Sequence, residues 1–261
     1  MPTPLYEAIR DYWDARPCNI RHSDQPVGTR AYFDAVELRK YRVEPHIIAL
    51  ADFRRWKGKT VLEIGCGIGT DTINFARFGA HVTALDLSPE AVKITRQRAA
   101  VYDLPVTVLE GNIEYPNHGL TAGTFDLVYA FGVLHHIPDL ETALDKIHAF
   151  LNAGGTFKLM VYHRWSWKNL LVHLRLAQPE AQARCPIYNT YSQRDMRALL
   201  EQAGFTVERI AVEHIFPWRI AEYVNYQYVK AWPWRIMPPR LFRWLEHRIG
   251  FHLCITARKS Q

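Results

Sequence analysis

The feature that most constrains the fold is TVLEIGCGIGTDTINFARFGAHVTALDLSPEAV, residues 60–92. An apolar run leads there into glycines at every second position, Gly65, Gly67 and Gly69. Glycines permit a tight turn and a close approach of the backbone to a ligand, which side chains would block. The pattern therefore predicts a strand, a ligand-binding turn, and a helix that begins near Thr70.

An acidic residue, Asp86, ends the next apolar run, 17 residues beyond Gly69. A carboxylate at this distance from a glycine turn can accept hydrogen bonds from both hydroxyls of a ribose. The alternative is an acid that only caps a loop. Thr70 stands where the dinucleotide fingerprint GxGxxG needs its third glycine, and Glu63 lies in the strand end. A carboxylate beside the turn suits a ligand that carries an ammonium group better than one that carries two phosphates.

Strand-like and helix-like segments alternate beyond this stretch. The β-rich apolar runs are 60–65, 81–86, 106–111, 125–131 and 156–163, and the helical segments between them are 70–79, 89–102 and 139–151. A helix at 192–203 then precedes two more apolar runs, 205–215 and 251–259. Short β-rich runs separated by helices predict βαβ units and a parallel sheet, and thus an α/β fold.

Three segments lie outside this alternation. Residues 1–58 contain two expected helices, around 4–15 and 30–42, which we interpret as a helical cover before a main domain at 59–261. Residues 164–191 and 216–250 are rich in tryptophan, proline and arginine and hold six of the eight tryptophans. We interpret them as insertions that form an aromatic lid.

Composition limits the class of protein. The chain is 48% hydrophobic and 22% charged, and its longest uncharged apolar-rich run, 127–138, is far shorter than the ~20 residues of a membrane span. The four cysteines are scattered and show no ligand spacing, so we expect a soluble protein of the reducing cytoplasm. Histidines 22, 46 and 163 would form a metal site only if folding brought them together, and no metal site is predicted.

The net charge of +6 raises nucleic acid or an anionic membrane surface as a partner. No run of five basic residues occurs, and acidic residues are interspersed, which favours an ordinary solvated basic face. We therefore expect no nucleic acid partner. Peripheral contact with a membrane surface through the Trp- and Arg-rich C-terminal insertion remains open, as does the oligomeric state.

Five motifs together resemble the class I S-adenosylmethionine-dependent methyltransferases, over about residues 30–215 and the final strand. They are VLEIGCGIG, ALDLS, GNIE, FDLVYAFGVLHHI and LNAGGTF, in the order typical of that family. The resemblance implies a Rossmann-like, seven-stranded, mostly parallel sheet with an antiparallel last strand. It also implies S-adenosylmethionine as the cofactor.

The resemblance assigns these residues to the cofactor: Tyr32, Tyr41, Glu63, Gly65, Gly67, Asp86, Leu87, Asn112, Ile113, Phe131 and Gly132. Glu63 and the first two glycines would line the methionine moiety, and Asp86 would bind the ribose. Leu87, Asn112 and Ile113 would contact adenine, although many family members carry aspartate in place of Asn112. Phe131 and Gly132 would flank the methyl donor, and one of the two tyrosines could contact the cofactor's carboxylate.

Candidate catalytic residues follow the fourth and fifth strands or precede the first. They are His135, His136, Tyr162, Glu44 and His46. A histidine can act as a general base, which methyl transfer needs only where the acceptor must lose a proton. The sequence LHHI is also a common structural ending of the fourth strand in this family, so a structural role for either histidine stays open.

We expect methyl transfer to a small or medium, partly apolar acceptor, at oxygen. One alternative is a methyltransferase that acts on RNA or on protein. Another is a non-catalytic protein that binds S-adenosylmethionine. A nicotinamide-dependent dehydrogenase on a similar sheet is disfavoured by Thr70.

Overall fold

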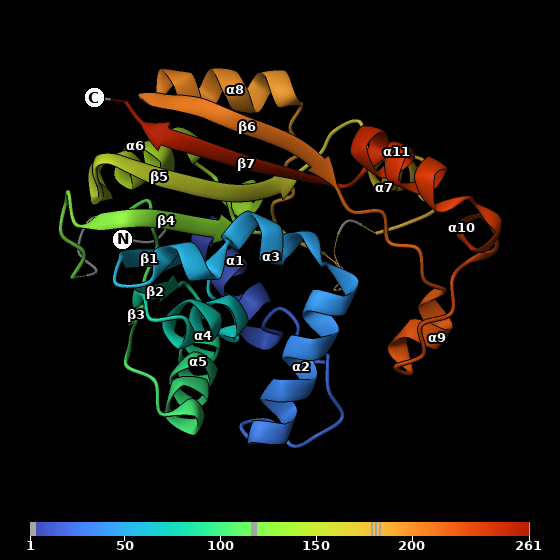
Figure 1. Ribbon diagram of the computed structural model, residues 1–261, viewed down its shortest axis with the longest axis horizontal. Helices are drawn as coiled ribbons and strands as arrows, with labels where there is room; N and C mark the ends of the chain where they lie inside the picture. Colours follow the sequence, from blue (N-terminus) through green and yellow to red (C-terminus); the bar gives the residue numbers. More distant parts are fainter. Residues whose placement is uncertain (1–3, 116–118, 179, 181, 183, 261) are drawn as a thin grey trace.

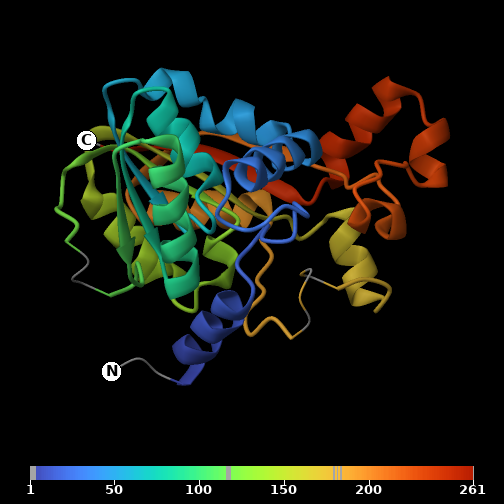
Figure 2. The same ribbon diagram turned by 90° about the horizontal axis from the view of Figure 1, so that it is seen from below.

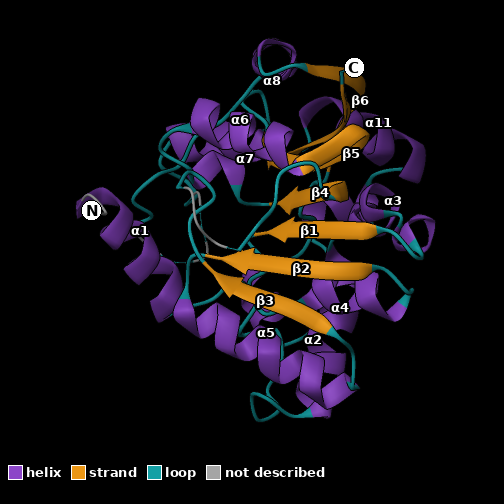
Figure 3. Cartoon of the chain, turned by 90° about the vertical axis from the view of Figure 1, so that its left-hand side faces the viewer, coloured by secondary structure: helices purple, strands orange, loops and turns teal. Residues whose placement is uncertain are grey.

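The computed structural model describes residues 4–115, 119–178, 180, 182 and 184–260. Within them, a central sheet has seven strands in the order β3-β2-β1-β4-β5-β7-β6 (Figures 1 and 3). The strands are β1 (Thr60–Ile64), β2 (His81–Asp86), β3 (Val106–Glu110), β4 (Phe125–Phe131), β5 (Leu151–Tyr162), β6 (Phe205–Glu213) and β7 (His252–Lys259). This confirms the predicted α/β, Rossmann-like fold.

The direction of the strands determines which residues meet at one edge of the sheet. Strands β1 to β5 pair in parallel, whereas the last strand, β7, runs antiparallel to both neighbours, β5 and β6, as predicted. The start of β7 therefore lies beside the carboxyl ends of β5 and β6. In register, His252 pairs with Tyr162 on one side and with Glu213 on the other.

Helices cover both faces of the sheet. They are α1 (Pro4–Ala15), α2 (Arg30–Val43), α3 (His46–Ala51), α4 (Thr70–Arg77), α5 (Pro89–Tyr102), α6 (Leu140–Phe150), α7 (Trp167–His173), α8 (Gln193–Gln202), α9 (Ile220–Val224), α10 (Trp232–Ile236) and α11 (Pro239–Ile249), with short 3-10 helices η1 (Phe53–Trp56) and η2 (Leu134–His136). On one face, Leu144 of α6 and Leu200 of α8 belong to the largest apolar cluster. On the other, Phe75 of α4 and Phe53 of η1 pack against β1.

Local signals explain where the helices and strands begin. Helix α5 starts as expected, because the Ser88 side chain accepts a hydrogen bond from the Ala91 amide at 3.0 Å and Pro89 occupies the first turn. Helix α4 instead starts from Gly69, whose φ of +74° is left-handed. Strand β5 begins earlier than predicted, at Leu151, because Leu151 pairs with Phe125 before a register shift in β4.

The segments outside the alternation take two positions. Helix α1 lies against α5, where the Asp14 carboxylate accepts hydrogen bonds from the Ser88 hydroxyl and the Glu90 amide. Helices α7, α9, α10 and α11 lie together at one end of the molecule (Figures 1 and 2). The division into a cover at 1–58 and a main domain at 59–261 stays a prediction.

The described residues contain no helix that is long and apolar enough to cross a membrane. The cytoplasmic location stays a prediction.

Candidate functional site

A cavity lies at the carboxyl ends of β1, β2, β4 and β5. Residues from each of the five motifs meet in it, except from LNAGGTF, which forms the first half of β5. The predicted residues that line it are Glu44, Glu63, Gly65, Gly67, Asp86, Leu87, Asn112, Ile113, Phe131, Gly132, His136 and Tyr162. Parallel strands explain this convergence, because their carboxyl ends share one edge of the sheet.

The glycine turn has the backbone that only glycine adopts readily. Gly65 has a φ of +71°, and an added Cβ would overlap the Val133 side chain. Gly67 has a φ of +55°, but a Cβ there would meet no protein atom within 4 Å. Because Gly67 also lines the cavity, this open space leaves its backbone accessible to a ligand.

Asp86 is held in place by the turn. Its two carboxylate oxygens accept hydrogen bonds from the Gly67 amide at 2.8 Å and from the Ser88 amide at 2.9 Å. A carboxylate has about four acceptor positions, so each oxygen keeps capacity for a ribose hydroxyl. Burial raises the pKa of Asp86 to about 6, against the lowering effect of the backbone donors.

Two buried carboxylates, Glu63 and Asp71, lie beside the turn. The Thr72 hydroxyl donates to Glu63, whereas Asp71 pairs with the Lys40 ammonium at 2.9 Å and accepts a hydrogen bond from the Tyr41 hydroxyl, also at 2.9 Å. Burial and, to a lesser extent, the charge of Asp71 raise the pKa of Glu63 to about 8. A bound ammonium group would favour the charged form of Glu63.

Sequence reasoning missed Lys40 and Asp71, both of which line the cavity. Asp71 could have been found from the sequence, because it is an acidic residue in the first turn of the helix that follows the glycines. Lys40 could not have been found, because nothing in the sequence distinguishes it from the other basic residues on α2.

Helix α1 closes the cavity near the third strand. Its side chains Tyr6, Ile9 and Trp13 line the cavity, and the Tyr6 hydroxyl donates to Glu114 at 2.7 Å. The Asn112 side-chain oxygen accepts a hydrogen bond from the Glu114 amide at 2.9 Å. These helix residues carried no motif, and only their contacts in the fold place them at the site.

The half of the cavity near β4 and β5 is aromatic. Phe131, Met160 and Tyr162 line it, and the Tyr162 ring stacks on His135 with centroids 3.6 Å apart. His136 bonds through Nδ1 to the Ile187 carbonyl at 2.7 Å. A carbonyl only accepts, so Nδ1 carries the proton and Nε2 keeps its lone pair. Burial lowers the pKa of His136, which keeps the ring neutral.

Four predicted residues are not among those that line the cavity. Tyr32 is fully buried and its hydroxyl donates to the Ile20 carbonyl at 2.8 Å, because it lies on the inner face of α2. The Tyr41 hydroxyl reaches Asp71 instead. His135 is buried behind Tyr162, and His46 bonds through Nε2 to His252 Nδ1 at 2.9 Å.

Comparison with known proteins identifies the family. Residues 36–210 match a family model described as a methyltransferase domain, which covers more than half of the chain. The chain belongs to the class I S-adenosylmethionine-dependent methyltransferases. A ubiquinone biosynthesis O-methyltransferase of Xanthomonas axonopodis pv. citri is 30% identical to this methyltransferase over 215 residues, or 80% of this chain and 81% of that protein.

Solved structures share the fold of this methyltransferase. Magnesium protoporphyrin IX methyltransferase from Synechocystis PCC 6803, solved with bound SAH, has a TM-score of 0.63 at 17% identity and covers 97% of this chain and 99% of its own. A methyltransferase solved in complex with the Haloferax volcanii Trm112 activator has a TM-score of 0.65 at 20% identity and covers 97% and 98%.

The cofactor of this methyltransferase is S-adenosylmethionine. The cavity fits that molecule in two respects. Asp86 keeps acceptor capacity beside an open glycine backbone, and the buried carboxylate of Glu63 lies within the same cavity. Asp86 therefore suits a ribose, and Glu63 suits an ammonium group.

The methyltransferase also gathers two groups of metal-ligand side chains among its described residues. They are Glu44 with His214 and His252, and His135 with His136 and Glu180. Neither is the predicted alternative of His22, His46 and His163. Glu180, His214 and His252 were missed because each lies in or next to an irregular segment and no spacing in the sequence links them.

Proposed function

We propose that this methyltransferase transfers a methyl group to an oxygen atom of a small or medium, partly apolar acceptor. One observation carries the proposal: the cavity that holds Asp86 and the glycine turn continues to an aromatic half with Phe131, Met160 and Tyr162. An acceptor there would lie between the cofactor and the ends of β4 and β5. Transfer to oxygen is also the reaction in the name of the Xanthomonas relative.

The same proposal assigns the cofactor contacts. Asp86 binds the ribose hydroxyls, Glu63 binds the ammonium group, and Leu87, Asn112 and Ile113 surround adenine. Phe131 and Gly132 lie next to the reacting methyl group. Lys40, paired with Asp71, meets the cofactor's carboxylate, a role that the sequence analysis assigned to Tyr32 or Tyr41.

The chemistry requires orientation above all. When bound, S-adenosylmethionine would supply a methyl group that the acceptor oxygen takes up in line, while the C–S electron pair leaves with S-adenosylhomocysteine. The aromatic walls hold the acceptor in a near-attack position and exclude water. His136 Nε2, which lies 3.6 Å from Glu180 Oε1 and has no hydrogen-bond partner among the described residues, accepts the proton of the acceptor hydroxyl.

The proposal is tested with methyl-labelled cofactor and a panel of phenols, catechols and long-chain hydroxy compounds. We expect label in one acceptor class and a fall in kcat of about 100-fold or more for His136→Gln, since a general base contributes about that much. Glutamine keeps a donor for the Ile187 carbonyl but cannot take up the proton. His148→Gln, on α6, serves as the control. Label in RNA or protein from a lysate, with none in the panel, would overturn the proposal.

We further propose that α10 and α11 contact an anionic membrane surface. Trp232 is 70% exposed, Trp244 is 55% exposed, and Arg240 and Arg243 lie on the same helix as Trp244. Exposed tryptophan beside arginine is typical of helices at a lipid interface.

Flotation with phosphatidylcholine vesicles, with and without phosphatidylglycerol, tests this surface. We expect binding only to the anionic vesicles, reduced several-fold in Trp232→Ala/Trp244→Ala. Leu38→Ala is the matched control, because Leu38 is an equally exposed apolar residue on α2. Equal recovery of all three proteins would contradict the proposal.

A further inference from the structure

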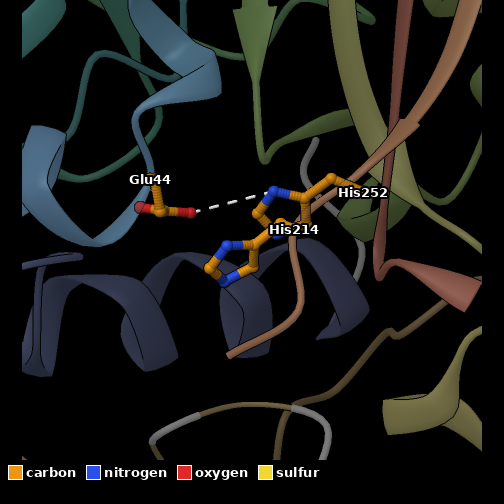
Figure 4. A group of neighbouring side chains, drawn as sticks. All are labelled: Glu44, His214 and His252. Carbon is orange, nitrogen blue, oxygen red and sulfur yellow. Dashed lines mark ion pairs between the residues drawn. The ribbon is translucent and has the colours of Figure 1, made fainter. Parts of the chain in front are cut away.

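Glu44, His214 and His252 come from three separate parts of the chain and point toward one another (Figure 4). Glu44 follows α2, His214 follows β6, and His252 begins β7. The nitrogen and oxygen atoms that they offer all lie within 4.8 Å of one another. The antiparallel course of β7 explains this, because it brings its first residue beside the end of β6.

We propose that these three side chains form a binding site for a divalent transition-metal ion of the zinc type. Two imidazoles and one carboxylate are a known ligand set for catalytic zinc, which leaves a fourth position open for water or substrate. Ligands of a tetrahedral zinc ion stand about 3.4 Å apart. His252 Nδ1 and Glu44 Oε1 are 3.8 Å apart, which is close to this separation.

The surroundings hold the two histidines close together. His214 and His252 are buried, and their rings stack with centroids 4.6 Å apart. His252 Nδ1 also bonds to His46 Nε2 at 2.9 Å, so an ion bound at this nitrogen would replace that hydrogen bond. The nearby Lys40 ammonium is paired with Asp71, which reduces its repulsion of a cation.

The position of the site gives the ion a role. Glu44 and His252 line the cavity at its acceptor half, and the Phe131 ring lies edge-on to His252 with centroids 5.7 Å apart. An ion there could bind the acceptor's oxygen and lower the pKa of its hydroxyl, as a Lewis acid does. This role rests on the proposed function, whereas the metal site itself does not.

Calorimetric titration of chelator-treated protein with Zn²⁺ tests the site. We expect about one equivalent bound to the wild type, and at least a tenfold loss of affinity in Glu44→Gln and in His214→Gln, since even outer contacts change metal affinity by 10–100-fold. His163→Gln is the control: this buried histidine lies near the group, but bonds to the Gly250 carbonyl. Binding of S-adenosylhomocysteine, measured in the same samples, shows that each variant is folded.

Three results would overturn the proposal: no stoichiometric zinc in folded wild type, unchanged affinity in both variants, or a loss confined to His136→Gln. The last would assign the ion to His135, His136 and Glu180 instead. Zinc binding is measured without an acceptor, so a failed acceptor panel does not affect it. Zinc bound at Glu44 and His214 without any effect of chelation on methyl transfer would reject only the Lewis-acid role.

Discussion

Asp86→Ala is expected to weaken the binding of S-adenosylhomocysteine by about 1.5–3 kcal/mol, which is roughly 10- to 150-fold. The physical reason is the loss of a charged acceptor for the ribose hydroxyls. The Gly67 amide also loses its partner, so the turn that approaches the ligand is less well fixed. Calorimetry on the folded variant measures the change.

The matched control for Asp86 is Glu110→Ala. The two carboxylates pair in register at the ends of neighbouring strands, but Glu110 is exposed and is not among the residues that line the cavity. Its removal should leave the affinity unchanged. Equal losses in both variants, or no loss in Asp86→Ala, would reject the ribose assignment.

Gly65→Ala is expected to destabilise the protein by about 2–5 kcal/mol. Two separate effects destabilise this variant. A left-handed backbone with φ +71° is strained for alanine, and the new Cβ overlaps Val133. Urea denaturation followed by circular dichroism measures the free energy of unfolding.

Gly154→Ala separates the two effects. Gly154 has almost the same φ, +70°, but an added Cβ meets nothing within 4 Å. This variant should lose only the conformational part, about 1–2 kcal/mol. Adding Val133→Ala to Gly65→Ala should recover part of the loss. Equal destabilisation by the two single variants would show that the contact with Val133 is unimportant.

The cofactor half could be predicted from the sequence because its determinants are local. A glycine turn after a strand, and an acid at the end of the next strand, must lie at the same edge once the strands pair in parallel. Gly65, Gly67 and Asp86 therefore reach one cavity. The strands were located for the same reason, since each is a short apolar run between helices.

The acceptor half could not be predicted in the same way. His214 and His252 become neighbours only through antiparallel pairing of β6 with β7, and Trp13 reaches the cavity only because α1 folds across it. Neither contact corresponds to a motif with a fixed spacing that could be recognised in the sequence. Tyr32 is a residue for which the prediction from sequence was wrong. Its side chain is buried on the inner face of α2, and its hydroxyl donates to the Ile20 carbonyl and not to a ligand.

The most direct test of the cofactor pocket is calorimetric titration of the purified protein with S-adenosylhomocysteine, with NAD and NADP in parallel. The structure and the family predict binding of S-adenosylhomocysteine alone, with a Kd in the micromolar range or tighter. Binding of a nicotinamide nucleotide in its place, or of none of the three, would contradict the assignment of the glycine turn and Asp86.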